Sequence, residues 1–177
     1  KNGETPLCRS DILFSKLQGV IPEFVQSCEK LGVCYTNVMP DHEDKKSGQG
    51  RSWYSTLGVS NKLNAEKKLN TLGYQWEWMH DGSLKVKTAV LPAVKILDNK
   101  RRVFFNQLIA AYRGWKDERN EPHNNIFFGD GSTIPIKDMK IVIELADQLT
   151  FDLEWETGDI ALIDNYLVMH GRRPYKG

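Results

Sequence analysis

Residues 158–175 read GDIALIDNYLVMHGRRPY, and this stretch decides how the rest of the chain is interpreted. The apolar run Ile160–Ile163 predicts a buried strand. A second apolar run, Leu167–Met169, leads directly to His170 and a Gly-Arg-Arg turn. A histidine at the mouth of a buried strand can be a metal ligand or a hydrogen-bonded core residue, and local context alone favours the core residue.

Short strands and helices are expected along the rest of the chain. Capping signals, apolar spacing and turn residues predict helices over Ser10–Leu17, Pro22–Leu31, Ser60–Leu72, Leu108–Tyr112 and Ile136–Leu149. Strands are predicted over Val33–Met39, Tyr74–His80, Leu84–Leu91, Ala93–Leu97, Arg102–Asn106 and Phe151–Trp155. Ser10 and Ser60 are expected to cap their helices, and Asp81-Gly82 to turn a hairpin. No parallel strand-helix-strand series is visible, so we expect a mostly β fold with inserted helices, built on a curved antiparallel sheet or barrel.

Composition narrows the classes of function. The chain has 177 residues, enough for one domain with a hydrophobic core, and a formal net charge of +1. Balanced charge and the lack of a basic-aromatic stripe argue against a nucleic-acid partner, and the apolar runs are too short to give a membrane span. The three cysteines, Cys8, Cys28 and Cys34, lack metal-type spacing and predict small buried thiols in a reducing compartment. We expect a cytoplasmic location, with an organelle as the alternative.

The order of residues from Gly158 to Tyr175 resembles the closing segment of the taurine dioxygenase-like family of Fe(II)- and 2-oxoglutarate-dependent oxygenases. In that family a Gly-Asp pair, an apolar strand and an Asp-Asn pair precede a histidine. A small residue, an arginine and an aromatic residue follow it. The resemblance implies that His170 is the iron ligand that lies distal in the sequence.

Three further stretches resemble the same family. Gly3-Glu4-Thr5 resembles a segment whose threonine contacts 2-oxoglutarate, and that threonine matches Thr5. Val103–Gln107 and Phe128–Gly131 resemble a strand and a loop of the clavaminate synthase-like branch. The resemblance therefore covers residues 1–177 as a single, partial oxygenase domain. It implies a double-stranded β-helix (jelly-roll) core that is incomplete in this chain.

The resemblance also implies a chemistry. Many non-haem iron(II) oxygenases bind the metal through two histidines and one carboxylate, and leave positions open for further ligands. The expected cofactors are Fe(II) and the cosubstrate 2-oxoglutarate, and the expected partner is a small-molecule substrate that is hydroxylated or otherwise oxidised at a C–H bond. Arg172 and Arg173 are candidates for binding a carboxylate of the cosubstrate, or else are solvated or structurally paired arginines of the turn. The sequence assigns no further catalytic residue and no oligomeric state.

Two parts of the family pattern have no counterpart at the matching places. The family's His-x-(Asp/Glu) pair precedes the Gly-Glu-Thr segment, and its 2-oxoglutarate-binding arginine follows the distal histidine. The chain is therefore expected to be cut short at both ends. His42-Glu43-Asp44 spells His-x-Asp in the polar loop 40–50, and we interpret it as a chance match. The alternative function is a non-catalytic relative or fragment that acts as a binding module.

Overall fold

The structure of the protein, a computed structural model, describes residues 3–47, 50–98, 100–114, 119–120 and 125–173. The chain divides into two compact units: residues 1–30, 92–106 and 137–177 form unit 1, and residues 31–91 and 107–136 form unit 2. The sheets in the described part are antiparallel and carry helices between their strands, as expected. Helices hold more of these residues than strands do, so the helical insertions are more extensive than the sequence predicted.

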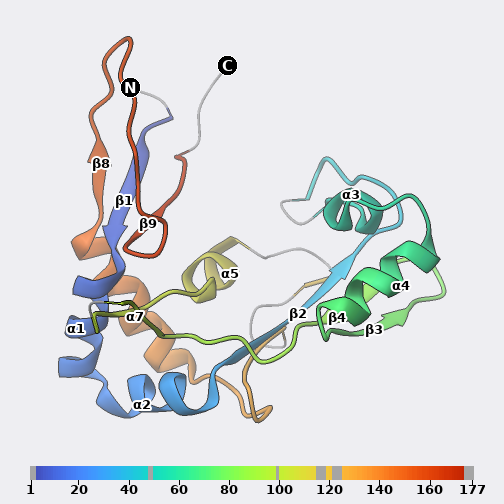
Figure 1. The fold of residues 1–177 in the computed structure, drawn as a ribbon, viewed down its shortest axis with the longest axis horizontal. Coiled ribbons are helices and arrows are strands. Elements are labelled where there is room, and N and C mark those ends of the chain that lie inside the picture. The colour runs from blue at the N-terminus through green and yellow to red at the C-terminus, as the bar shows by residue number, and fades with distance from the viewer. Residues whose placement is uncertain (1–2, 48–49, 99, 115–118, 121–124, 174–177) are drawn as a thin grey trace. The chain divides into compact units, whose positions relative to one another are not determined.

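Unit 1 is built on a three-stranded sheet in the order β8-β1-β9 (Figure 1). The strands are β1 (Thr5–Arg9), β8 (Phe151–Leu153) and β9 (Val168–His170). The central strand comes from the beginning of the chain and both outer strands come from its end. This order places β1, which begins at Thr5, beside β9, which ends at His170.

Helices α1 (Ser10–Val20), α2 (Pro22–Leu31) and α7 (Ile136–Leu149) accompany this sheet. The predicted bounds of α2 and α7 are confirmed, and α1 continues three residues beyond the predicted Leu17. Pro22, in the first turn, marks the start of α2, and Gly32, at φ +64°, marks its end.

The prediction that Ser10 caps α1 was wrong. Arg9 occupies the N-cap position without a side-chain capping bond, and Ser10 is already the first helical residue. The Ser10 hydroxyl instead donates to the carbonyl oxygen of Tyr166 at 2.8 Å, because the chain leading into β9 passes beside the start of the helix.

The predicted strands over Ala93–Leu97 and Arg102–Asn106 form a hairpin of β5 (Lys95–Ile96) and β6 (Arg102–Val103). Both strands are shorter than predicted. Phe104, which follows β6, is fully buried, and its ring centroid lies 6.3 Å from that of Phe24 on α2. The hairpin and the helices therefore share one apolar core.

Unit 2 contains a four-stranded sheet in the order β3-β4-β2-β7. Its strands are β2 (Val33–Met39), β3 (Gln75–Trp78), β4 (Leu84–Lys87) and β7 (Ile126–Phe128). The predicted Asp81-Gly82 turn is confirmed: Gly82 has φ +82°, and the Asp81 carboxylate accepts a hydrogen bond from the Ser83 N–H at 2.9 Å. Strand β4 ends before the predicted Leu91. The Tyr35 N–H donates to the Thr88 hydroxyl oxygen instead of to a backbone carbonyl, and this interrupts the ladder.

The helices in the described part of unit 2 are α3 (Trp53–Leu57), α4 (Lys62–Thr71) and α5 (Leu108–Gly114). Helix α5 was predicted, and α3 was missed because its five residues are too few to show a helical period. Asn61, rather than the predicted Ser60, caps α4, since its side chain accepts from the Asn64 N–H at 2.9 Å.

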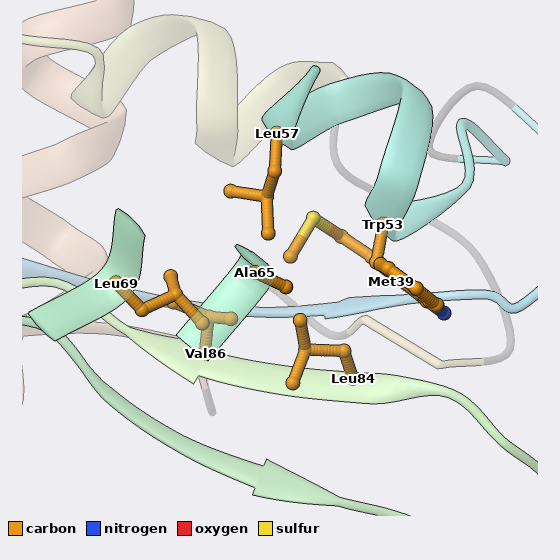
Figure 2. Close-up of a cluster of buried hydrophobic side chains, with 7 residues drawn as sticks. All are labelled: Met39, Trp53, Leu57, Ala65, Leu69, Leu84 and Val86. Atoms are coloured by element: carbon orange, nitrogen blue, oxygen red, sulfur yellow. The ribbon is translucent and has the colours of Figure 1, made fainter. Parts of the chain in front are cut away.

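One apolar cluster holds α3 and α4 against the sheet of unit 2 (Figure 2). Its buried side chains are Met39, Trp53, Leu57, Ala65, Leu69, Leu84 and Val86. Ala65 and Leu69 on α4 are fully buried, whereas Leu72 is exposed beyond the end of the helix. The side chains of Trp76 and Trp78 on β3 pack against the cluster.

The three cysteines are free and buried, which confirms them as small core thiols. None of the helices among the described residues combines the length and the apolar character needed to cross a bilayer.

Candidate metal centre

The pairing of β1 with β9 brings Thr5 and His170 together, although they lie at opposite ends of the sequence. Leu7 lies directly opposite His170 in this ladder. Side chains alternate between the faces of a strand, so Thr5, two residues before Leu7, shares the face of His170. Diagonal neighbours of this kind lie about 7–8 Å apart in antiparallel pairs. The two residues that the resemblance implicates most specifically therefore share one surface of the sheet.

Hydrogen bonds fix the chain just before His170. The backbone N–H of Ser10 donates to Leu167 O at 2.8 Å, beside the bond from its hydroxyl to Tyr166 O. The Asp164 carboxylate accepts from the Tyr166 N–H at 2.9 Å and closes the preceding turn. Asp164 thus stabilises this turn, and β9 enters the sheet in a defined register.

The His170 side chain is exposed at the end of β9, so the alternative of a hydrogen-bonded core histidine is wrong. Its imidazole forms no hydrogen bond or ion pair with the residues that the structure describes. A neutral imidazole with an accessible nitrogen fits a first-row metal such as iron. Over the same described ranges, no three His, Cys, Asp or Glu side chains come together as a metal site. His170 is therefore a candidate for one ligand of a metal site and not for a complete ligand set.

Thr5 is the first residue of the central strand of this sheet, and its hydroxyl has a side-chain partner. The indole Nε1–H of Trp155 donates to the Thr5 hydroxyl oxygen at 3.1 Å. Leu153 lies opposite Thr5 in the β1–β8 ladder, so Trp155, two residues further on, approaches from the same side. The sequence suggested no such contact, because Trp155 alternates with Phe151 and Leu153 as the last residue of a predicted strand.

The two candidate arginines differ in their surroundings. The Arg173 Nε donates to the Asp152 carboxylate at 2.7 Å, and its backbone N–H donates to Glu4 O at 3.0 Å. Asp152 raises the pKa of the Arg173 guanidinium above its usual value, through this hydrogen bond and its charge. Arg173 therefore links the chain after β9 to β8, while Arg172 is exposed.

The His42-Glu43-Asp44 motif lies in a loop of unit 2. The His42 side chain is 87% exposed, and Asp44 forms an ion pair with Arg119 at 3.0 Å. Glu43 accepts a hydrogen bond from the Ser52 hydroxyl at 3.1 Å. Both carboxylates thus hold the loop in place, which supports the interpretation of this motif as a chance match.

The two weaker stretches of the resemblance have structural roles in their own units. Asn106 Nδ2 donates to Ala93 O at 2.8 Å and so ties the chain after β6 to the segment before β5. Gly129 lies so close to Leu31 that an added Cβ would come within 2.0 Å of its carbonyl oxygen. A side chain at residue 129 would therefore collide with the backbone.

The prediction of a buried strand over Ile160–Ile163 was wrong. Ile160 is 95% exposed and Leu162 is 100% exposed, and the segment is not assigned to a strand. Apolar composition alone does not make a strand, because each strand needs a neighbour for its backbone groups, and none of the described segments pairs with this one. Phe151 on β8 and Trp155, which follows this strand, are also about half exposed.

A comparison with known families decides the classification. The model of the family described as "Taurine catabolism dioxygenase TauD, TfdA family" matches residues 3–177. The chain belongs to the TauD, TfdA family. This match confirms the resemblance of the chain to the taurine dioxygenase-like family, and makes a non-haem oxygenase the class of protein to which the chain is related.

Two relatives illustrate the family. The chain is 37% identical over 174 residues to a clavaminate synthase-like protein of Arabidopsis thaliana, covering 98% of this chain and 53% of that protein. It is 23% identical over 193 residues to the dapdiamide synthesis protein DdaC of Enterobacter agglomerans, covering 100% of this chain and 54% of that protein. The chain spans about half the length of both relatives.

Proposed function

We propose that the chain contributes to the site of an Fe(II)- and 2-oxoglutarate-dependent oxygenase that hydroxylates, or otherwise oxidises at a C–H bond, a small metabolite. One observation carries the proposal: the β1–β9 register puts Thr5 and His170 on one face of the sheet as diagonal neighbours. Membership in the TauD, TfdA family supports the chemistry. We further propose that the antiparallel β8-β1-β9 sheet is part of a double-stranded β-helix core.

Each residue on this face has a role that its chemistry allows. His170 would supply an imidazole nitrogen to the metal, and Thr5 would supply a hydroxyl to a carboxylate of the cosubstrate. Bound iron, with 2-oxoglutarate and dioxygen, supplies the oxidising power. Phe151 and Leu153 lie opposite Leu7 and Thr5 in the β1–β8 ladder and give this face apolar neighbours. Arg172 and Arg173 are proposed partners of carboxylates, with Arg173 also bound to Asp152.

The test measures Fe(II) affinity under anaerobic conditions, and iron-dependent conversion of 2-oxoglutarate to succinate, in the natural full-length protein. We expect His170→Ala to lower iron affinity by at least about tenfold, because a direct metal ligand is lost. The matched control is His42→Ala, which removes an exposed histidine and leaves both readouts unchanged. A wild-type protein that binds neither iron nor 2-oxoglutarate would reject the oxygenase and favour the non-catalytic binding module.

A further inference from the structure

Trp155 and Thr5 form a contact that spans 150 positions of sequence. The indole nitrogen lies 3.1 Å from the hydroxyl oxygen, and the indole reaches Thr5 from the β8 side of the sheet. Strand β9, with His170, borders β1 on the opposite side. Thr5 therefore lies between an N–H donor from the segment after β8 and a candidate metal ligand on β9.

The donor and acceptor properties of the two groups determine where the threonine proton can go. An indole N–H can only donate, whereas a hydroxyl has one donor and two acceptor positions. By accepting from Trp155, the Thr5 oxygen uses one lone pair and keeps its own O–H for another acceptor. Donation from Trp155 also polarises that O–H, which makes it a better donor.

We propose that Trp155 is a positioning residue that prepares the Thr5 hydroxyl to donate a hydrogen bond to the carboxylate of a 2-oxo acid bound beside His170. This inference rests on the proposed function, and it adds the residue that orients the hydroxyl. A carboxylate is the acceptor that gains most from such a donor, because charge-assisted hydrogen bonds are shorter and stronger than neutral ones. Trp155 acts only through Thr5 and does not touch the ligand.

A purely structural role for Trp155 makes a different prediction. The indole is 47% exposed among the described residues and carries apolar surface as well as its N–H. If only this surface mattered, Trp155→Phe would be harmless, and any effect would persist without the Thr5 hydroxyl. If the N–H positions the hydroxyl, the effect of Trp155→Phe must vanish once that hydroxyl is removed.

The experiment measures the dissociation constant of 2-oxoglutarate by calorimetry on the Fe(II)-loaded full-length protein without oxygen. The variants are Thr5→Val, Trp155→Phe and the double variant. We expect Thr5→Val to weaken binding by about tenfold or more, the value of one charge-assisted hydrogen bond. Trp155→Phe alone weakens it by roughly threefold. The double variant binds like Thr5→Val. Iron affinity and thermal midpoint stay at their wild-type values.

The matched control is Trp76→Phe, the same substitution on β3 of unit 2, which leaves 2-oxoglutarate affinity unchanged. Equal affinity of wild type and Trp155→Phe overturns the inference and leaves the proposed function intact. The same loss from Trp155→Phe with and without the Thr5 hydroxyl also overturns it. A wild-type protein that binds iron but not 2-oxoglutarate overturns the proposed function and this inference together.

Discussion

The side-chain amide of Asn120 pairs with both backbone groups of Val38. Asn120 Oδ1 accepts from the Val38 N–H at 2.9 Å, and Nδ2 donates to the Val38 carbonyl oxygen at 3.2 Å. Asn120 is 1% exposed, so the pairing occurs out of contact with water. The amide thus acts as one residue of a neighbouring strand and satisfies both polar groups of β2 at this position.

Removing this amide should destabilise the protein. Asn120→Ala leaves the N–H and C=O of Val38 buried without these partners, which costs about 1–3 kcal/mol. The free energy of unfolding, measured by urea denaturation, checks this value. Asn70→Ala is the control, because Asn70 is exposed on α4 and its replacement by a good helix former costs nothing. Equal stability of Asn120→Ala and wild type would show that the paired amide contributes nothing.

Two leucines of α4 should respond differently to truncation. Leu69 is fully buried in the apolar cluster of unit 2, whereas Leu63 on the same helix is 60% exposed. Leu69→Ala removes buried methyl groups and leaves a cavity, which costs about 2–5 kcal/mol. Leu63→Ala changes stability by about 0.5 kcal/mol or less. Urea denaturation followed by tryptophan fluorescence tests both, and equal losses would contradict the packing of α4.

The sequence predicted those elements that carry strong local signals. Strand β2 and helices α2 and α7 have the predicted bounds, because a proline, a glycine or a long apolar period marks them. Helix α3 has only five residues, so no period could reveal it. The segment Ile160–Ile163 was misinterpreted because burial depends on which other segments cover it, and composition does not contain that information.

The candidate site was predictable in part. The resemblance singled out Thr5 and His170, but only the strand register shows that they share a face of one sheet. The role of Trp155 could not be predicted, since a tryptophan that alternates with apolar residues usually belongs to a core. Its hydrogen bond to Thr5 connects β1 with the segment after β8, and long-range contacts of this kind leave no local pattern in a sequence.

Two glycines should respond in opposite directions to substitution by alanine. A Cβ at Gly129 would lie 2.0 Å from Leu31 O, so Gly129→Ala must displace backbone and should cost about 1–3 kcal/mol. A Cβ at Gly19, near the end of α1, would meet nothing within 4 Å. Gly19→Ala should therefore stabilise the protein by about 0.5 kcal/mol, because alanine loses less backbone entropy. Thermal midpoints check both signs, and a stabilised Gly129→Ala would contradict the close approach.

Cys28 should make stability depend on pH in the alkaline range. Burial raises the pKa of its thiol to about 12, with smaller contributions from the charges of Glu29 and Asp138. The unfolded chain releases this proton near the ordinary value of 9.0, so above that pH the folded state holds more protons than the unfolded one. The contribution of the thiol to stability is therefore complete below pH 9 and is lost as the pH rises towards 12. The free energy of unfolding falls by at most about 1.4 kcal/mol per pH unit in this range.

We expect the stability difference between wild type and Cys28→Ala, measured by urea denaturation, to shrink from pH 9 upwards. A difference that stays constant to pH 11 would show that the folded protein ionises Cys28 as readily as the unfolded chain does.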